Sequence, residues 1–171
     1  KQLNFSLTID QVTVLKEINN DLCSTNKMFR LLQGDVGCGK TIVSLLSAFN
    51  TINSGFQVAV MAPTEILAKQ HYNLAQKIFP KNLKIDLISG KSDLSDKKII
   101  QKKLLEHKID IIFGTHAIFQ KKIIFKKLGL IIIDEQHKFG VNQRKKLSDK
   151  GGDDCDVLLM TATPIPRTLT M

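Results

Sequence analysis

Six short apolar runs, separated by polar or helix-like segments, constrain the fold of this chain more than any other feature of its sequence. Several of these runs are apolar throughout, which is typical of parallel strands that are covered on both faces. The predicted strands are 28–33, 57–62, 84–88, 110–113, 130–134 and 156–160, and the predicted helices include 64–79 and 92–107. This alternation predicts one α/β domain over residues 1–171, built as a three-layer, doubly wound, mostly parallel sheet.

The clearer of the two helices begins after Thr64, a candidate N-cap whose hydroxyl can accept a backbone N–H of the first turn. Ile66, Leu67, Leu74 and Ile78 fall on one side at helical spacing, so we expect them to form the face that packs on the sheet. The second helix is less cleanly amphipathic.

The stretch GDVGCGKT has the spacing G-x-x-x-x-G-K-T and lies between a predicted strand and a predicted helix. Gly34, Gly37 and Gly39 allow the loop to curl until successive backbone N–H groups can bind an anion. The following helix adds its positive N-terminal end, Lys40 can contact the outer phosphates, and the Thr41 hydroxyl can ligate Mg²⁺. The alternative is a glycine-rich turn with a chance lysine, but the strand before it and the helix after it favour a phosphate-binding loop.

Two adjacent carboxylates, Asp134 and Glu135, follow the apolar run GLIII. Ligands of open parallel sheets bind beyond the carboxyl ends of the strands, so these acids and the glycine-rich loop are expected at one edge. Asp134 would hold Mg²⁺ directly or through water, and Glu135 would orient and deprotonate the attacking water. The alternative is that the acids only cap the strand at the surface. Together with the loop, they predict a nucleoside triphosphatase.

Charge and cysteine content restrict the partners and the compartment of the chain. The net charge of +9, with a pI near 9.5, fits a polyanionic partner and equally a lysine-rich solubility coat. The three cysteines and four histidines show neither disulfide nor zinc spacing, which favours a reducing cytosol. No apolar run approaches the ~20 residues of a membrane span. The first residue, Lys1, is not methionine, so we expect a fragment of a longer protein.

Five motifs resemble those of superfamily-two helicases, in the order in which that family carries them. GDVGCGKT, APTEILAKQH, GTHAIFQ, DEQH with KFGVNQR, and MTATPIPRTL are similar to motifs I, Ia, Ib, II and III, and the likeness runs from Phe5 to Met171. The combination is most similar to bacterial helicases that remodel stalled forks and drive branch migration. The resemblance implies the first of two RecA-like motor lobes, with ATP and Mg²⁺ as cofactors, branched or double-stranded DNA as partner, and a location in the bacterial cytosol.

The resemblance also implies that a second motor lobe and an N-terminal wedge domain of the same protein lie outside this chain. The second lobe normally supplies an arginine finger, worth ~10³–10⁵ in rate, so we expect the chain alone to bind ATP weakly and barely hydrolyse it. The alternatives are the motor lobe of a transcription-repair coupling or primosomal translocase, and a non-catalytic nucleotide- or DNA-binding module. Those translocases typically carry Glu at the position of Gln136, which favours the fork-remodelling helicases.

Further site residues follow from the resemblance, and most have a simpler structural explanation. Gln11 would recognise the adenine edge, although Thr8 and Gln11 also fit a T-x-x-Q capping box at a helix start. His137 would link the nucleotide site to the TAT motif, unless it is an ordinary core or surface histidine. The residues that would line a DNA track, or that only cap helices and contact solvent, are Thr64, Lys69, His71, Gly90, Lys91, Thr115 and His116.

Overall fold

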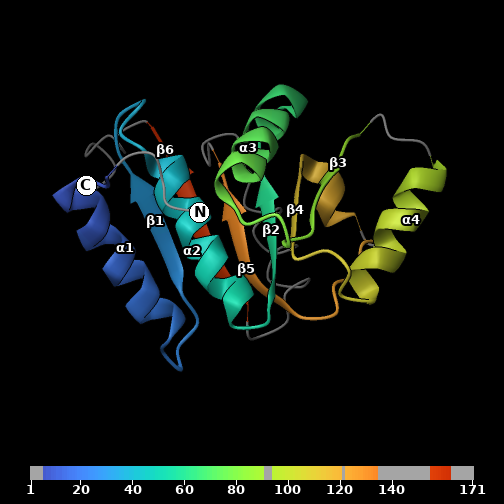
Figure 1. The fold of residues 1–171 in the computed structure, drawn as a ribbon, viewed down its shortest axis with the longest axis horizontal. Coiled ribbons are helices and arrows are strands. Elements are labelled where there is room, and N and C mark those ends of the chain that lie inside the picture. Colours follow the sequence, from blue (N-terminus) through green and yellow to red (C-terminus); the bar gives the residue numbers. More distant parts are fainter. Residues whose placement is uncertain (1–5, 91–93, 121, 135–154, 163–171) are drawn as a thin grey trace, which may run out of the picture.

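The computed structural model describes residues 6–90, 94–120, 122–134 and 155–162, which form a six-stranded sheet flanked by helices (Figure 1). In chain order the elements are α1 (Ile9–Leu22), β1 (Phe29–Gln33), α2 (Lys40–Asn53), β2 (Gln57–Met61), α3 (Glu65–Ile78), β3 (Ile85–Ile88), α4 (Leu94–Leu105), β4 (Ile111–Gly114), the 3₁₀ helix η1 (His116–Phe119), β5 (Leu128–Ile133) and β6 (Asp156–Thr161). All six predicted strands and both predicted helices are confirmed, with small differences at their ends. Within the described ranges, no helix has the length and apolar character that a membrane span needs.

The strands lie in the order β1-β6-β5-β2-β4-β3, and every neighbouring pair is parallel. Between β1 and β5 the chain forms β2, β3 and β4, and it returns from β4 through the short η1 instead of a full helix. Since all strands run in one direction, their carboxyl ends lie at a single edge, which is the edge that positions ligands in such sheets. The predicted doubly wound parallel architecture is therefore confirmed.

Apolar side chains cover both faces of the sheet, which makes three layers. In the central strand β5, Leu130 and Ile132 belong to the core on one face, whereas Ile131 and Ile133 belong to the core on the other. The first core contains residues of α1, α2 and α3, and the second contains residues of α4 and η1. In Figure 1, α2 lies across the front of the central strands and α4 lies at the β3 side of the sheet. Burial on both faces explains why these strands are apolar throughout.

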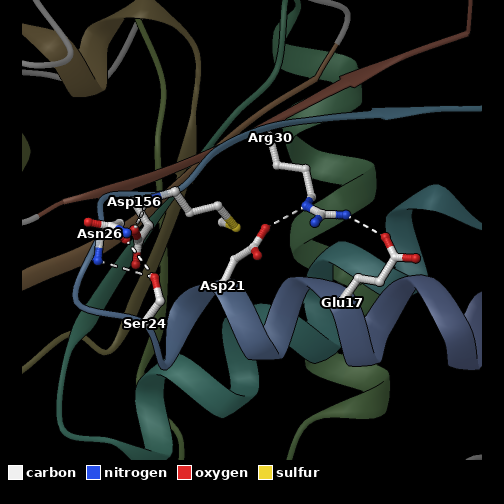
Figure 2. A network of polar contacts seen from close by, with 7 residues as sticks. Glu17, Asp21, Ser24, Asn26, Arg30 and Asp156 are labelled. Carbon is white, nitrogen blue, oxygen red and sulfur yellow. Dashed lines mark hydrogen bonds and ion pairs between the residues drawn. The ribbon is translucent and has the colours of Figure 1, made fainter.

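Helix α1 is fixed to the edge strand β1 by a charged side chain (Figure 2). Arg30, on β1, donates from Nη1 to Glu17 at 2.6 Å and from Nε to Asp21 at 2.7 Å. These hydrogen bonds, first that to Glu17 and then that to Asp21, raise the pKa of Arg30. The helix that carries Gln11 is therefore held at its far end against the strand that leads into the glycine-rich loop.

A buried glutamine joins two connecting segments to the start of β2. Gln57 is fully buried, and its Nε2 donates to the carbonyl oxygens of Leu104 at 3.0 Å and Ile109 at 2.8 Å. Its Oε1 accepts from the backbone N–H groups of Lys126 at 2.9 Å and Lys127 at 3.0 Å. One amide thus satisfies four backbone groups from the segments on either side of β4, which no local sequence pattern indicated.

The packing face of α3 is rotated from the predicted one, although Leu74 and Ile78 do pack against the core. Ile66 was expected to face the sheet, but it is 73% exposed. The buried residues of the helix are Ala68, His71 and Ala75, with Leu74 and other larger side chains only partly buried beside them. Small side chains let the helix lie close to the sheet, and a histidine occupies the middle of the buried face.

Candidate functional site

The carboxyl edge of the sheet brings together segments that are far apart in the sequence. The backbone N–H of Gly34, after β1, donates to the carbonyl oxygen of Thr161 at the end of β6, at 3.3 Å. The backbone N–H of Asp134, after β5, donates to the carbonyl oxygen of Met61 at the end of β2, at 2.9 Å. In the sheet β6 alone separates β1 from β5, so the glycine-rich loop and Asp134 begin about 10 Å apart, two strand spacings.

The glycine-rich loop has the backbone conformation that its sequence requires. Gly37 has φ 85° and Gly39 has φ 90°, which are left-handed values that side chains with a Cβ disfavour. Gly39 is also the N-cap of α2, so Lys40 and Thr41 lie in the first turn of that helix. A Cβ on Gly39 would lie 2.2 Å from Nε2 of Gln11, so a side chain there would displace the Gln11 amide.

The ammonium group of Lys40 is folded back onto the loop that precedes it. Nζ donates to the carbonyl oxygens of Gly34 at 2.6 Å and Asp35 at 2.7 Å. Within the described part of the chain, no carboxylate lies within 4.0 Å of this nitrogen. A cation with neutral partners beside the N-terminus of a helix is a favourable environment for a polyanionic ligand.

Gln11 contacts the loop and the start of its own helix at the same time. Its Oε1 accepts from the backbone N–H of Thr8 at 3.0 Å, and Thr8 Oγ1 accepts from the N–H of Gln11 at 3.2 Å, so the predicted capping box is confirmed. Its Nε2 donates to the carbonyl oxygen of Cys38 at 2.9 Å. These bonds use one of the two amide donors and one of the oxygen lone pairs. Capping and recognition of an adenine edge are therefore compatible.

Asp134 is paired with His71, a contact that the sequence did not predict. Nε2 of His71 lies 2.7 Å from Oδ2 of Asp134, and the two side chains are 9% and 16% exposed. His71 was predicted as a DNA contact, but its burial places it beneath the surface that a duplex could touch. The structure therefore places His71 next to Asp134, the predicted metal ligand, and not on the predicted DNA-binding surface.

Two other predicted DNA contacts lie together at the start of α3. Thr64 is the N-cap of the helix, and its Oγ1 accepts from the N–H of Leu67 at 3.3 Å, as predicted. The N–H of Gly90 donates to Oε1 of Glu65 at 3.0 Å, so a carboxylate already occupies the donor that a DNA phosphate would need. Lys69 is exposed on the same helix.

The remaining predicted contacts are distributed between the described and the undescribed parts of the chain. Thr115 is half-buried and His116 is exposed at the start of η1, directly after β4. Lys91, Glu135 and His137 lie outside the described residues.

Two oxygen-bearing side chains of the carboxyl edge are candidate metal ligands. Thr41 lies in the first turn of α2 and Asp134 follows β5. Within the ranges that the structure describes, no group of three His, Cys, Asp or Glu side chains could hold a metal ion by itself. Mg²⁺ prefers one or two protein oxygen ligands completed by phosphate oxygens and water, so this sparse donor set fits that ion in a nucleotide complex.

A cavity of about 570 Å³ opens at a different place, near the amino ends of the strands. It lies between the C-terminal ends of α1 and α2, and its lining includes Asn19, Asn26, Asn50, Phe56 and Asp156. Figure 2 shows part of this region, where Ser24, Asn26 and Asp156 gather at the end of α1. The cavity is remote from the glycine-rich loop, so the chemistry of the carboxyl edge does not depend on it.

The parallel sheet, the glycine-rich loop between β1 and α2, and an acid after β5 define the class of RecA-like P-loop domains. The family model "DEAD/DEAH box helicase" matches residues 8–171, and the chain belongs to this family. The chain is 50% identical over 169 residues to the ATP-dependent DNA helicase RecG of Streptococcus pneumoniae, and 49% identical over 172 residues to that of Bacillus subtilis. Each match covers 99% or more of this chain and 25% of the relative, so the chain spans about a quarter of their length.

Solved structures show the same fold. The structure of RecG bound to a three-way DNA junction matches 98% of this chain and 22% of that protein, with a TM-score of 0.83 and 44% sequence identity. The UvsW helicase of bacteriophage T4 matches 93% of this chain and 53% of that protein, with a TM-score of 0.69 at 16% identity, a likeness of fold alone.

Proposed function

We propose that this chain is the ATP-binding first motor domain of a RecG-like DNA helicase that remodels stalled forks and drives branch migration. The observation that carries the proposal is the convergence of the glycine-rich loop and Asp134 at the carboxyl edge, in a chain about half identical to RecG. The domain would span residues 1–171, and a second motor lobe and a wedge domain would belong to the same, longer protein. Such a protein would work in the bacterial cytosol.

The glycine-rich loop would bind the phosphates of ATP. Gly34, Gly37 and Gly39 would let the backbone N–H groups surround the phosphates, and the N-terminus of α2 would add its partial positive charge. Lys40 would exchange its two carbonyl partners for the outer phosphates, because a charged acceptor gives the stronger hydrogen bond. Gln11 would hold the adenine edge with its remaining donor and lone pair.

Thr41 and Asp134 would hold Mg²⁺ between the loop and the end of β5. When bound, the ion would neutralise charge on the phosphates and fix their orientation. Glu135 would orient and deprotonate the attacking water, and His137 would link this site to the following motif. The role of Glu135 is predicted from its position directly after the strand, and that of His137 comes from the resemblance; both residues lie outside the described ranges.

DNA would lie along the carboxyl edge beyond β2, β3 and β4, where Thr64, Lys69, Gly90, Thr115 and His116 follow the strand ends, with Lys91 next to them in the sequence. The net charge of +9 favours contacts to phosphates, which position a duplex without selecting its sequence. Binding of this kind weakens steeply with salt.

The test is ATP hydrolysis by the full-length protein with forked, duplex and single-stranded DNA. We expect the highest rate with forked DNA, and equal rates with all three substrates would contradict the proposal. Glu135→Gln should keep ATP binding and abolish turnover, whereas Lys40→Ala should weaken binding itself. The 171-residue chain alone should hydrolyse ATP ~10³–10⁵ times more slowly, because the arginine of the second lobe is missing.

A further inference from the structure

His71 contacts Asp134 at the carboxyl edge, which the motifs did not predict, and we propose that it is a positioning residue for the metal site. In this role it holds the carboxylate of Asp134 in the orientation that ligates Mg²⁺. The inference rests on the proposed function of Asp134, and it removes His71 from the set of DNA contacts.

The chemistry of the two groups identifies the donor and the acceptor in the contact between His71 and Asp134. A carboxylate oxygen can only accept, so Nε2 of His71 is the donor in the 2.7 Å contact to Oδ2 of Asp134. Both side chains are largely buried, and a hydrogen bond to a charged acceptor is stronger than a neutral one. The backbone N–H of Asp134 donates to Met61 at 2.9 Å. The β2–α3 unit therefore holds Asp134 at two points, one on the backbone and one on the side chain.

This arrangement leaves one carboxylate oxygen for the ion. Among the described residues, Oδ1 of Asp134 has no hydrogen-bond partner, whereas Oδ2 is occupied by His71. Without that bond, the aspartate at the end of β5 could rotate about both of its side-chain torsions. Residues that orient a metal-ligating carboxylate typically contribute 10–100-fold to metal affinity or activity, as hydrogen-bonded outer partners do in many metal sites.

The position of His71 on α3 argues against a purely packing role. Its neighbours on the buried face, Ala68 and Ala75, are small and apolar, and they let the helix approach the sheet. An apolar side chain would fill the place of His71 equally well for packing. The imidazole adds a donor directed at a residue 63 positions away in the sequence, at the edge where the nucleotide loop lies.

The test compares two amide variants in the full-length protein. His71→Gln keeps an N–H donor at about the reach of Nε2, whereas His71→Asn is one methylene shorter and cannot make the bond. For each, the Mg²⁺ concentration that half-saturates binding of a fluorescent ATP analogue is measured, together with the affinity for the same analogue in EDTA. We expect His71→Asn to raise the Mg²⁺ requirement about 10–100-fold and His71→Gln to recover most of that loss. Metal-free affinity should be unchanged in both.

Tyr72→Leu is the matched control, because Tyr72 is the next residue of α3 and packs edge-to-face on Phe113. It should lower the melting temperature without changing the Mg²⁺ requirement. The inference is overturned if His71→Asn leaves that requirement unchanged, if it weakens metal-free binding equally, or if His71→Gln behaves like His71→Asn. Lys40→Ala separates this inference from the proposed function. If that variant binds nucleotide as the parent does, the proposed nucleotide site itself is wrong.

Discussion

Replacing the buried Gln57 by leucine removes four hydrogen bonds at once and is the sharpest test of how this fold is held together. Leucine keeps most of the volume, but it removes the side-chain donor to the carbonyl oxygens of Leu104 and Ile109. The carbonyl of Leu104 keeps the backbone N–H of His107 as a donor, at 3.2 Å. The backbone N–H groups of Lys126 and Lys127 lose their acceptor in the same step. The two segments that flank β4 would then be tied to β2 only by the sheet and by apolar packing.

The size of the effect follows from the number of bonds. A hydrogen bond contributes about 0.5–1.5 kcal/mol net, and a buried group left unpaired costs about 1–3 kcal/mol. Four lost bonds, with three of the groups left unpaired, therefore bound the loss between about 2 and 10 kcal/mol, but connecting segments can open toward water and satisfy some of the groups. We expect a decrease of about 3–5 kcal/mol in the free energy of unfolding, a large part of the 5–15 kcal/mol typical of a domain.

The assay is urea unfolding of the 171-residue chain followed by far-UV circular dichroism, since the chain has no tryptophan and one tyrosine. The matched control is Gln76→Leu on the exposed face of α3, where we expect a change within about 0.5 kcal/mol. Gln57→Glu should be at least as harmful as Gln57→Leu, because a carboxylate would face two carbonyl oxygens. A loss below about 1 kcal/mol for Gln57→Leu, with an unchanged m value, would refute the reasoning.

Three further predictions concern the thiols, one carboxylate and one ion-pair cluster. Burial raises the pKa of Cys155 to about 12, whereas Cys23 and Cys38 are exposed. A thiol reagent should therefore label two cysteines in the native chain and the third only after unfolding. Rapid labelling of all three cysteines in the native chain would contradict the structure. Burial also raises the pKa of Asp156, so the folded state binds the proton more tightly and this group lowers stability as pH rises through the window above its ordinary pKa. Asp156→Asn, which keeps an acceptor, should therefore gain melting temperature relative to the parent between about pH 4 and pH 7. A constant difference in melting temperature between the two proteins over this pH range would contradict the prediction. Arg30→Leu should cost about 1 kcal/mol in urea unfolding, because its two ion pairs are partly exposed, and the loss should shrink in high salt.

The elements that the sequence predicted well are those specified by local chemistry. Apolar runs such as that of β5 are typical of parallel strands buried on both faces, and the glycines next to Lys40 favour a tight loop. The N-cap at Thr64 and the capping box at Thr8 and Gln11 follow from hydrogen bonds within four residues, so spacing alone was sufficient to predict them.

The features that the sequence did not predict depend on long-range contacts. Ile66 fits the apolar pattern of α3 but is exposed, because Ala68 and Ala75 bring the opposite side of the helix onto the sheet. The same rotation buries His71 against Asp134, and the roles of both residues depend on it. Gln57 looked like a polar residue at a strand start, and nothing near it in the sequence identifies the four groups that it satisfies.

The strand order has a consequence for the synthesis of this chain on the ribosome. β1 has a single partner, β6, and the contact of Met28 with Asp156 spans 128 residues. At about 5–20 residues per second, about 6–25 s pass between the translation of β1 and the translation of β6. Nascent chains stalled before residue 156 should therefore leave β1 open to protease and unable to retain nucleotide, although most of the remaining strands have already been translated.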